Sequence, residues 1–176
     1  MRKIIIIGAS GYAKVIAETI DLLDQIQIVG FIDDHIEKGT LVYEQLQVIG
    51  SVNDIQQLSS QCDAFVIGIG NNDVRKQIAD QYSGKMKFDT IIHPRAYVSK
   101  SAFLSEGVVV LAGSVINSNS KIGKHSIINS NAVVDHDCQI GEFVHLVIGT
   151  LVGSNSIVSG SIKTEIGQVI PAFSTI

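Results

Sequence analysis

The stretch KIGKHSIINSNAVVDHDCQI, residues 121–140, has an aliphatic side chain at every sixth position: Ile122, Ile128, Val134 and Ile140. The same period extends in both directions, and all twelve positions spaced six apart from residue 92 to residue 158 are aliphatic. From residue 98 onward, a small or β-branched residue stands two positions before each of them. An α-helix would require a period of about 3.6, so the pattern indicates the hexapeptide repeat of a parallel β-helix.

Each six-residue unit of such a helix forms one short strand and one turn. The aliphatic side chain fills the interior of a three-sided prism, and the small residue packs beside it. Three units make one coil of about 18 residues, so the unbroken run predicts about four coils. The period breaks after Val158, because Thr164 takes an interior position, and it resumes at Ile170 and Ile176. We therefore expect an irregular coil at SGSIKTEIGQ, residues 159–168.

The first half of the chain has a different pattern, in which apolar strands alternate with helices. The β-branched run at residues 4–7 is typical of a strand that is covered on both faces of a parallel sheet. The stretches 3–23, 26–34, 51–58 and 64–82 indicate, in order, a strand–turn–helix unit, a strand, a short helix capped by Ser51 or Asn53, and a second strand–turn–helix unit. This alternation predicts a Rossmann-like α/β domain with right-handed crossovers.

Three loops of this domain are expected to meet at the carboxyl ends of the strands, where such sheets bind ligands. They contain Gly8 to Tyr12, the pair Asp33 and Asp34, and Gly68 to Asn72. Glycines allow a phosphate to approach the backbone at a helix N-terminus, and acids can bind a ribose or a base edge. Each loop alone could be a plain turn, but their convergence favours a nucleotide site. The dinucleotide fingerprint is incomplete, because its third glycine is missing.

The two halves together resemble the bacterial sugar O- and N-acyltransferases. This group includes the sialic acid O-acetyltransferases and the acetyl-CoA-dependent N-acetyltransferases of nucleotide-linked 4-amino sugars. The resemblance covers essentially the whole chain and is carried by the motifs IIGASGYAKV, GFIDD, GIGNNDVRK, IHPRAYVS and NAVVDHDCQIGEFVHL. It implies that the β-helix is left-handed, that the assembly is a homotrimer, and that acetyl-CoA is the co-substrate.

The resemblance also assigns roles in the stretch DHDC, which begins just after the interior residue Val134. His136 matches the catalytic histidine of the family and would act as general base on the attacking amine or hydroxyl. Asp137 would fix the tautomer of the imidazole and raise its basicity. Asp135 is expected mainly to shape the turn. Cys138 occupies the small-residue position, so we expect it to be buried and not nucleophilic.

Other residues are assigned to the coenzyme. His145 matches the family histidine that contacts acetyl-CoA near its thioester, and Ile166 is the nearest match to a backbone contact with the coenzyme. Nine residues separate His145 from His136, which is one and a half faces of the prism. We therefore expect the two histidines to meet between neighbouring subunits. His93 and His125 have no such match and are expected to be structural or solvated.

The nucleotide-linked sugar is expected to bind to the N-terminal domain. The resemblance assigns this role to Ser10, Gly11, Tyr12, Asp33, Asp34 and Gly70. Many family members have histidine where this chain has Tyr12, and tyrosine carries no charge at neutral pH. The identity of the sugar is therefore left open.

We expect residues 1–82 to form the nucleotide-sugar domain, residues 83–93 a connector, and residues 94–176 the β-helix, without the closing C-terminal coils of the family. Those coils flank the coenzyme, so we expect weak coenzyme binding. Apolar residues outside the interior register are expected to need cover, which a trimer would provide; they include Val109, Val115, Ile127 and Phe143.

Composition restricts the function further. The net charge is −4 and no basic run occurs, which argues against nucleic acid as a partner. No segment has the roughly 18 continuous apolar residues of a membrane span, and the two cysteines form no disulfide framework or metal motif. We therefore expect a cytoplasmic acyltransferase without a metal. The alternatives are a sialic acid O-acetyltransferase, a nucleotide-sugar-binding protein that has lost transfer, and, more remotely, an NAD-dependent oxidoreductase.

Overall fold

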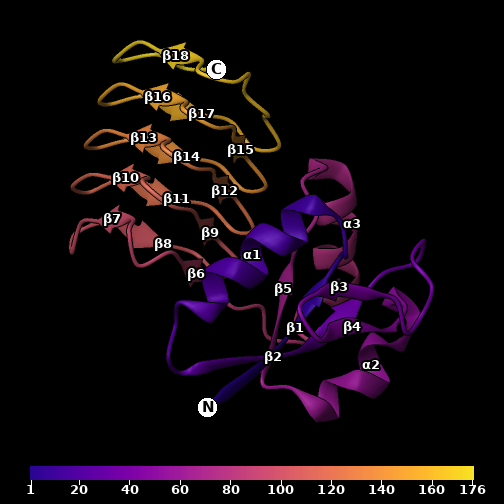
Figure 1. The fold of residues 1–176 in the computed structure, drawn as a ribbon. Helices are drawn as coiled ribbons and strands as arrows, with labels where there is room; N and C mark the ends of the chain where they lie inside the picture. The colour runs from indigo at the N-terminus through magenta and orange to yellow at the C-terminus, as the bar shows by residue number, and fades with distance from the viewer.

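The N-terminal part of the molecule is a five-stranded sheet with helices on both faces (Figure 1). The computed structural model describes all 176 residues. The strand order is β3-β4-β2-β1-β5, and β1, β2, β4 and β5 run parallel. Its elements are β1 (Arg2–Ile7), α1 (Gly11–Asp21), β2 (Ile26–Ile32), β3 (Leu41–Tyr43), β4 (Leu46–Gly50), α2 (Ile55–Leu58), β5 (Ala64–Ile67) and α3 (Asn72–Tyr82).

The sequence patterns anticipated this domain except at its edge. Strand β3 pairs antiparallel with β4 and forms a hairpin that the patterns did not reveal. Its residues are half-buried or exposed, so no clear apolar period marks it. The short helix begins where expected, with a 3-10 turn at Val52–Asp54 before α2. Ser51 is its N-cap, and the Asp54 carboxylate accepts hydrogen bonds from the Ser51 backbone N–H and hydroxyl.

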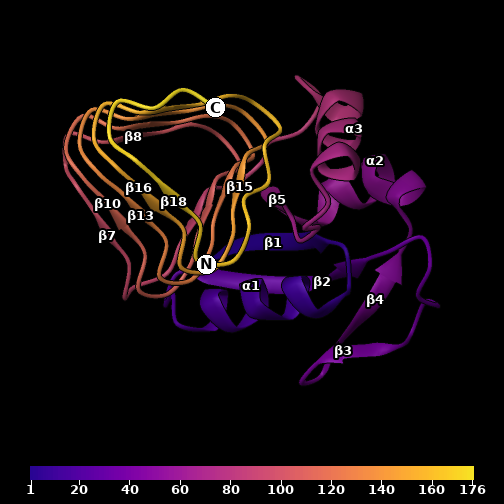
Figure 2. The same cartoon turned by 90° about the horizontal axis from the view of Figure 1, so that it is seen from above.

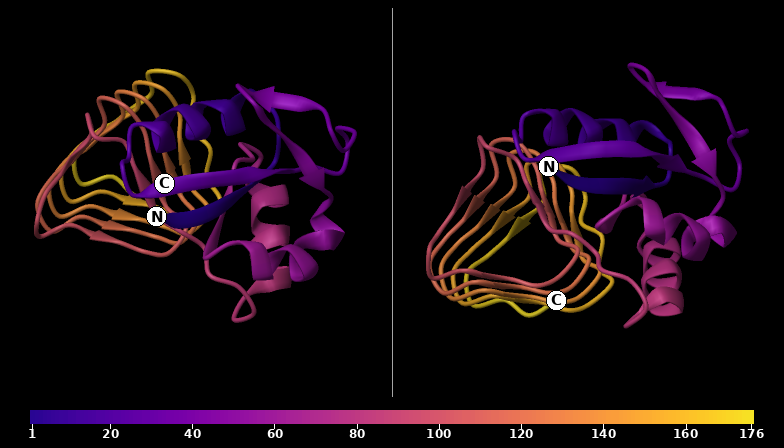
Figure 3. Two further views of the ribbon diagram at one scale, coloured as in Figure 1. Left: turned by 60° about the horizontal axis from the view of Figure 1, so that its bottom comes forward. Right: turned by 90° about the horizontal axis from the view of Figure 1, so that it is seen from below.

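The helices divide the buried residues of this domain into two layers. Helix α1 covers one face of the sheet, and α2 and α3 cover the other (Figures 2 and 3). In β1, Ile4 and Ile6 pack toward α1, whereas Ile5 and Ile7 pack toward α2 and α3. All four isoleucines are fully buried, which explains the continuous apolar run at residues 4–7.

The C-terminal part is a three-sided parallel β-helix with triangular coils (Figure 2). Equivalent residues pair 18 positions apart, as in Val115 with Val133 and Ile116 with Val134. The three sheets are β6-β9-β12-β15, β7-β10-β13-β16-β18 and β8-β11-β14-β17. Their two-residue strands are β6 (Ile91–Ile92), β7 (Tyr97–Val98), β8 (Phe103–Leu104), β9 (Val109–Val110), β10 (Val115–Ile116), β11 (Lys121–Ile122), β12 (Ile127–Ile128), β13 (Val133–Val134), β14 (Gln139–Ile140), β15 (His145–Leu146), β16 (Leu151–Val152), β17 (Ile157–Val158) and β18 (Val169–Ile170).

The sixth-residue pattern occupies the interior of this prism, as predicted. Val110, Ile116, Ile122 and their successors up to Val158 form one buried cluster with the small residues beside them. The corners repeat as well, because Asn119, Asp137 and Asn155 stand 18 residues apart and all have positive φ angles near +60°. The architecture is consistent with the left-handed β-helix that the resemblance implied.

The irregular coil after Val158 differs from the expectation in one respect. Thr164 is 3% exposed and lies inside the prism, so the coil is completed rather than broken there. Its hydroxyl contacts the Thr150 hydroxyl at 2.7 Å and accepts a hydrogen bond from the Val147 backbone N–H at 2.8 Å. A buried hydroxyl is tolerated here because neighbouring groups satisfy it both as a hydrogen-bond donor and as an acceptor.

No helix in the structure has the length and apolar character required to cross a membrane.

The N-terminal domain itself covers one face of the β-helix. Val109 and Ile127, from strands β9 and β12, are each 1% exposed, and Val109 joins the buried cluster beneath α1. Phe143 belongs to the cluster beneath α3. The expectation that a trimer covers these side chains was therefore wrong, because the chain's own first domain buries them. Of that set, only Val115 remains partly exposed on another face.

Candidate active site

His136 lies at the corner between β13 and β14 and forms a pair with the next residue. Its Nδ1 is 2.7 Å from Oδ2 of Asp137, and each side chain is about half exposed. The hydrogen bond that His136 donates to Asp137, more than the nearby charges, raises the pKa of His136, and the same contact lowers the pKa of Asp137. An ionised carboxylate only accepts hydrogen bonds, so Nδ1 carries the proton. The Nε2 atom is therefore the basic one and can take a proton from an incoming group.

The residues on either side of this pair, Asp135 and Cys138, stabilise the turn. The Asp135 carboxylate accepts hydrogen bonds from the His136 backbone N–H at 2.8 Å and from Nδ2 of Asn117 at 3.1 Å. Cys138 is fully buried at the small-residue position, where its thiol donates to the Gly153 carbonyl at 3.2 Å. Burial raises the pKa of this thiol. A buried, protonated thiol is a poor nucleophile, in line with the expectation for Cys138.

His145 lies far from this corner in the fold, on strand β15 of the sheet that faces the N-terminal domain. It is 6% exposed, and its Nδ1 is 3.3 Å from the Gly70 carbonyl oxygen while its Nε2 is 3.0 Å from Nδ2 of Asn129. Burial lowers the pKa of His145 to about 4, so the ring is neutral at pH 7. Its two partners assign the tautomer, because Nδ1–H donates to Gly70 and Nε2 accepts from Asn129. Within one chain, the structure does not bring His145 and His136 together.

Asn129 was missed by the sequence analysis. It directly follows the interior residue Ile128 and stands 16 residues before His145, so its position in the repeat resembles that of any turn residue. Only the stacking of β12 under β15 brings its amide to the imidazole. His125, expected to be structural or solvated, is buried between Phe88 and Phe143, at ring centroid distances of 4.9 Å and 5.3 Å.

A second missed residue, Arg75 of α3, joins the two domains. It is 1% exposed, and its guanidinium donates to the carbonyls of His125 (2.7 Å), Phe143 (3.1 Å) and Ile69 (3.0 Å) and to Oδ1 of Asn72 (2.7 Å). The Nδ2 atom of Asn72 donates in turn to the Ser161 carbonyl at 2.9 Å. Residues 125, 143 and 161 occupy the same corner of three successive coils, so two side chains of α3 dock onto a ladder of carbonyls. This contact, which we call the Arg75 clamp, positions the loop that contains Gly70 against β15.

The three N-terminal loops do converge on a cavity of about 280 Å³ at the carboxyl ends of the strands, lined by Gly8, Ser10, Ile32, Asp33, Asp34, His35, Val52, Ile69, Val74 and Ile78. The Asp33 carboxylate accepts hydrogen bonds from the backbone N–H groups of Ala9 (2.9 Å), His35 (2.8 Å) and Ile36 (3.1 Å). Asp33 thus ties two of the loops together. Asp34 accepts one, through Oδ1, from the Val52 N–H at 2.8 Å, which leaves Oδ2 free for a ligand.

The remaining predicted substrate residues, Gly11, Tyr12 and Gly70, do not line this cavity. Gly11 begins α1, and Gly70 faces His145. The Tyr12 ring lies 6.3 Å from the His145 ring, and its buried hydroxyl has no hydrogen-bond partner. Burial raises the pKa of Tyr12 far above its ordinary value, so the phenol stays protonated. Ile166 is 75% exposed and lies in the turn before β18, away from these residues.

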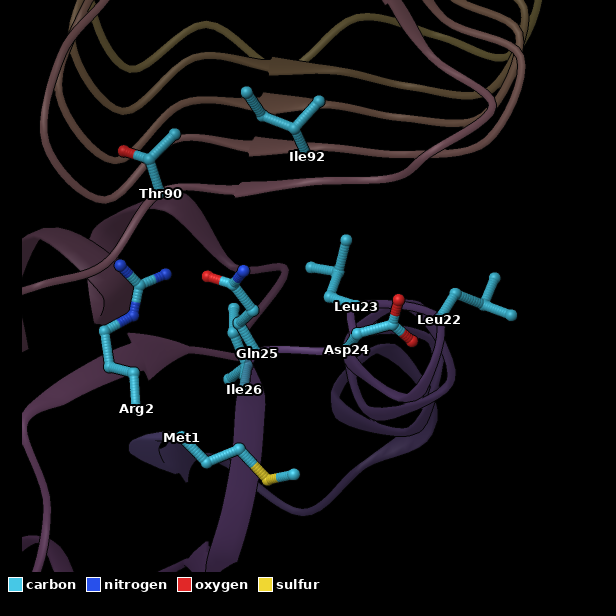
Figure 4. Close-up of a pocket in the computed structure, with 9 residues that line it drawn as sticks. All are labelled: Met1, Arg2, Leu22, Leu23, Asp24, Gln25, Ile26, Thr90 and Ile92. Atoms are coloured by element: carbon cyan, nitrogen blue, oxygen red, sulfur yellow. The ribbon is translucent and has the colours of Figure 1, made fainter.

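A larger hollow lies elsewhere, where the first coil meets the start of the sheet (Figure 4). Its volume is about 900 Å³, and it is lined by Met1, Arg2, Leu22, Leu23, Asp24, Gln25, Ile26, Thr90 and Ile92. It lies at the amino end of β1, opposite to the glycine loops, and none of the predicted site residues line it. Size alone therefore does not identify the functional site of this molecule.

Comparisons with known proteins agree with this architecture. Residues 3–82 match the family described as the PglD N-terminal domain. The acetyltransferase domain of PglB from Neisseria gonorrhoeae FA1090, solved in complex with acetyl coenzyme A, is 31% identical, with a TM-score of 0.79 over 99% of this chain and 95% of that chain.

Two further relatives are informative. Perosamine N-acetyltransferase from Caulobacter crescentus, solved with CoA and GDP-perosamine as a variant with one histidine replaced by asparagine, is 28% identical, with a TM-score of 0.76 over 99% of this chain and 88% of that chain. A UDP-N-acetylbacillosamine N-acetyltransferase from Bacillus subtilis (strain 168) is 39% identical over 116 residues, or 64% of this chain. The matched region spans about half, 52%, of that curated relative.

Proposed function

This chain belongs to the PglD-type sugar N-acetyltransferases, and from that premise we propose that it transfers the acetyl group of acetyl-CoA to the amino group of a nucleotide-linked sugar. The single observation that carries the proposal is the pair formed by His136 and Asp137, whose 2.7 Å contact leaves a basic Nε2 at an exposed corner of the β-helix. The relatives solved with acetyl coenzyme A, or with CoA and GDP-perosamine, support the choice of substrates.

In the proposed reaction, acetyl-CoA supplies the acetyl group as a thioester. The amine nitrogen of the sugar forms a bond to the carbonyl carbon of the thioester, and the Nε2 atom of His136 takes a proton from that amine. The bond between the carbonyl carbon and sulfur then breaks. The proton then passes from the imidazolium to the departing thiolate, so that CoA leaves as a thiol and His136 returns to its starting state. Asp137 stabilises the imidazolium that forms between these steps.

The substrate residues divide between direct and indirect roles in this proposal. Asp34, with one free carboxylate oxygen, and Ser10 bind the nucleotide directly, and Gly11 lets it approach the backbone. Asp33 acts by holding the loops. Tyr12 and Gly70 shape the contact with the β-helix.

For the coenzyme, we retain His145 and Ile166 as the proposed contacts. The backbone of Ile166 lies in an exposed turn that a ligand can reach. His145 is neutral and already has two partners, and a thioester only accepts hydrogen bonds, so a bound thioester would have to replace the Gly70 carbonyl as the acceptor of Nδ1–H. We also propose a cytoplasmic location, because acetyl-CoA and nucleotide-linked sugars are made there.

We further propose that the chain acts as a homotrimer. The sheet that contains β7, β10, β13, β16 and β18 turns an apolar column outward, and Tyr97, Leu151 and Val169 in it are 59%, 44% and 63% exposed. The His136 corner borders this sheet, so a neighbouring prism packed there would complete the site. Sedimentation should give about three times the 18.9 kDa chain mass, and a clean monomer would contradict the proposal.

The experiment that tests the function is an acetyl-transfer assay that follows release of the free CoA thiol. It compares UDP-, dTDP- and GDP-linked 4-amino sugars with CMP-sialic acid, which separates amino from hydroxyl acceptors. We expect turnover with at least one amino sugar and none with CMP-sialic acid. Nucleotide-sugar binding without thiol release from any acceptor would instead identify a binding protein.

A further inference from the structure

The coil beneath His136 contributes two asparagines that bind the two aspartates beside it. The Asn117 amide donates to Oδ1 of Asp135 and the Asn119 amide to Oδ1 of Asp137, each at 3.1 Å. Each donor stands 18 residues before its acceptor, because β10 and β13 are paired in parallel in successive coils. The corner of one coil thus supports the corner of the next.

The Asp137 carboxylate divides its oxygens between two partners. Oδ1 accepts from Asn119, and Oδ2 contacts Nδ1 of His136 at 2.7 Å. A carboxylate that is held at one oxygen cannot rotate freely about its last bond, so the other oxygen keeps a fixed direction. We propose that Asn119 is a positioning residue that holds Asp137 in the rotation that fixes the His136 tautomer and leaves Nε2 as the base.

Backbone geometry alone would explain an asparagine at this corner, since Asn119 has a φ of +61° and asparagine tolerates that region. The same corner of the coil above holds Asn155, with a φ of +58°, whose side chain makes no hydrogen bond. The repeat therefore provides its own comparison. Asn155 meets only the backbone requirement, whereas Asn119 has the additional contact with Asp137.

The charges around His136 come from its own corner. Asp135 and Asp137 are the charged groups that act on it. The coil below places Asn117, Ser118 and Asn119 at this corner, and the coil above places Gly153, Ser154 and Asn155 there, so neither brings an ionisable side chain. A change in the titration of His136 after substitution of Asn119 would therefore be transmitted through Asp137.

Two substitutions should move this titration in opposite directions. In Asn119→Gly, glycine still tolerates the left-handed backbone conformation, but Asp137 loses its hydrogen bond from position 119. The carboxylate then stabilises the imidazolium less, so the pKa of His136 falls. Asn119→Asp adds a negative charge to the corner, so the pKa of His136 rises. Because the base must be neutral, the acid limb of the kcat/KM profile shifts to lower pH in the first variant and to higher pH in the second.

The test measures two quantities in the wild-type chain, both Asn119 variants and the control Asn155→Gly. One is the titration and tautomer of His136 by NMR, with the signal assigned from a His136→Gln sample. The other is the pH profile of acetyl transfer, where we expect Asn119→Gly to lower kcat/KM about two- to tenfold, the range that one hydrogen bond contributes.

The proposal would be overturned by an unchanged His136 titration in Asn119→Gly, or by the same shift in Asn155→Gly. It rests on the proposed role of His136 in acetyl transfer, but the two can fail separately. If the wild-type chain transfers no acetyl group, the proposed function fails, and the NMR titration still decides whether Asn119 positions Asp137.

Discussion

Replacing Arg75 with methionine should destabilise the docking of the two domains. Methionine keeps much of the buried stem but removes all four hydrogen bonds of the guanidinium, which is 1% exposed. The carbonyls of His125 and Phe143 then lose a charged donor at a buried contact. Each acceptor left unsatisfied costs about 1–3 kcal/mol.

The net destabilisation is expected to be smaller than the sum of these costs, because burial of the guanidinium in the wild-type chain also costs free energy. Desolvation lowers the pKa of Arg75 to about 10, and the variant escapes that penalty. Two carbonyls at the lower end of the range, with a smaller loss at Ile69 and Asn72, predict a net destabilisation of about 3 kcal/mol. For a chain of this size, that corresponds to a fall in Tm of about 6–12 °C.

Thermal unfolding followed by circular dichroism measures this change. The matched control is Gln77→Met in the same helix, whose side chain is exposed and makes no hydrogen bond. A surface substitution of this kind usually changes stability by at most about 0.5 kcal/mol, so the control should lose no more than ~2 °C. If Arg75→Met and Gln77→Met had the same Tm, the Arg75 clamp would not hold the domains together.

Four further changes test other parts of the molecule. His136→Ala should lower turnover in the thiol-release assay by about 10²–10⁴-fold, the usual contribution of a general base. Asp137→Asn should lower it less and shift the acid limb of kcat/KM to lower pH, because the pKa of His136 is raised mainly by this carboxylate; a shift to higher pH would contradict the pairing. Asp34→Ala should weaken nucleotide-sugar binding in calorimetry without changing acetyl-CoA binding, and equal weakening of both would argue against separate sites. Gly141→Ala should lower Tm, since the new Cβ would lie 2.5 Å from backbone of the next coil, whereas Gly11→Ala, with open space around it, should not.

Sequence patterns predicted the elements whose determinants are local and periodic. Aliphatic residues recur at every sixth position because each coil needs aliphatic side chains inside the prism. The burial of residues such as Ile122 and Val134 can therefore be predicted from this period alone. The run at residues 4–7 and the glycine turns behave in the same way, because burial on both faces and positive φ restrict residue type directly. The β3–β4 hairpin was not predicted, since a half-exposed edge strand needs no regular pattern of apolar residues.

The sequence by itself therefore determined the two architectures, their order along the chain, and the stretch that holds the adjacent residues His136 and Asp137. Tertiary structure alone decided which distant groups meet. The Arg75 guanidinium reaches carbonyls 50 and 68 residues away, His145 binds the Gly70 carbonyl 75 residues away, and the amide of Asn119 lies under Asp137 because the coils stack 18 residues apart. Every residue has a backbone carbonyl, so an arginine that binds carbonyls does not require an acidic residue at a matching position in the sequence. An asparagine in a left-handed turn likewise has the same letter whether its amide binds a carboxylate or faces solvent.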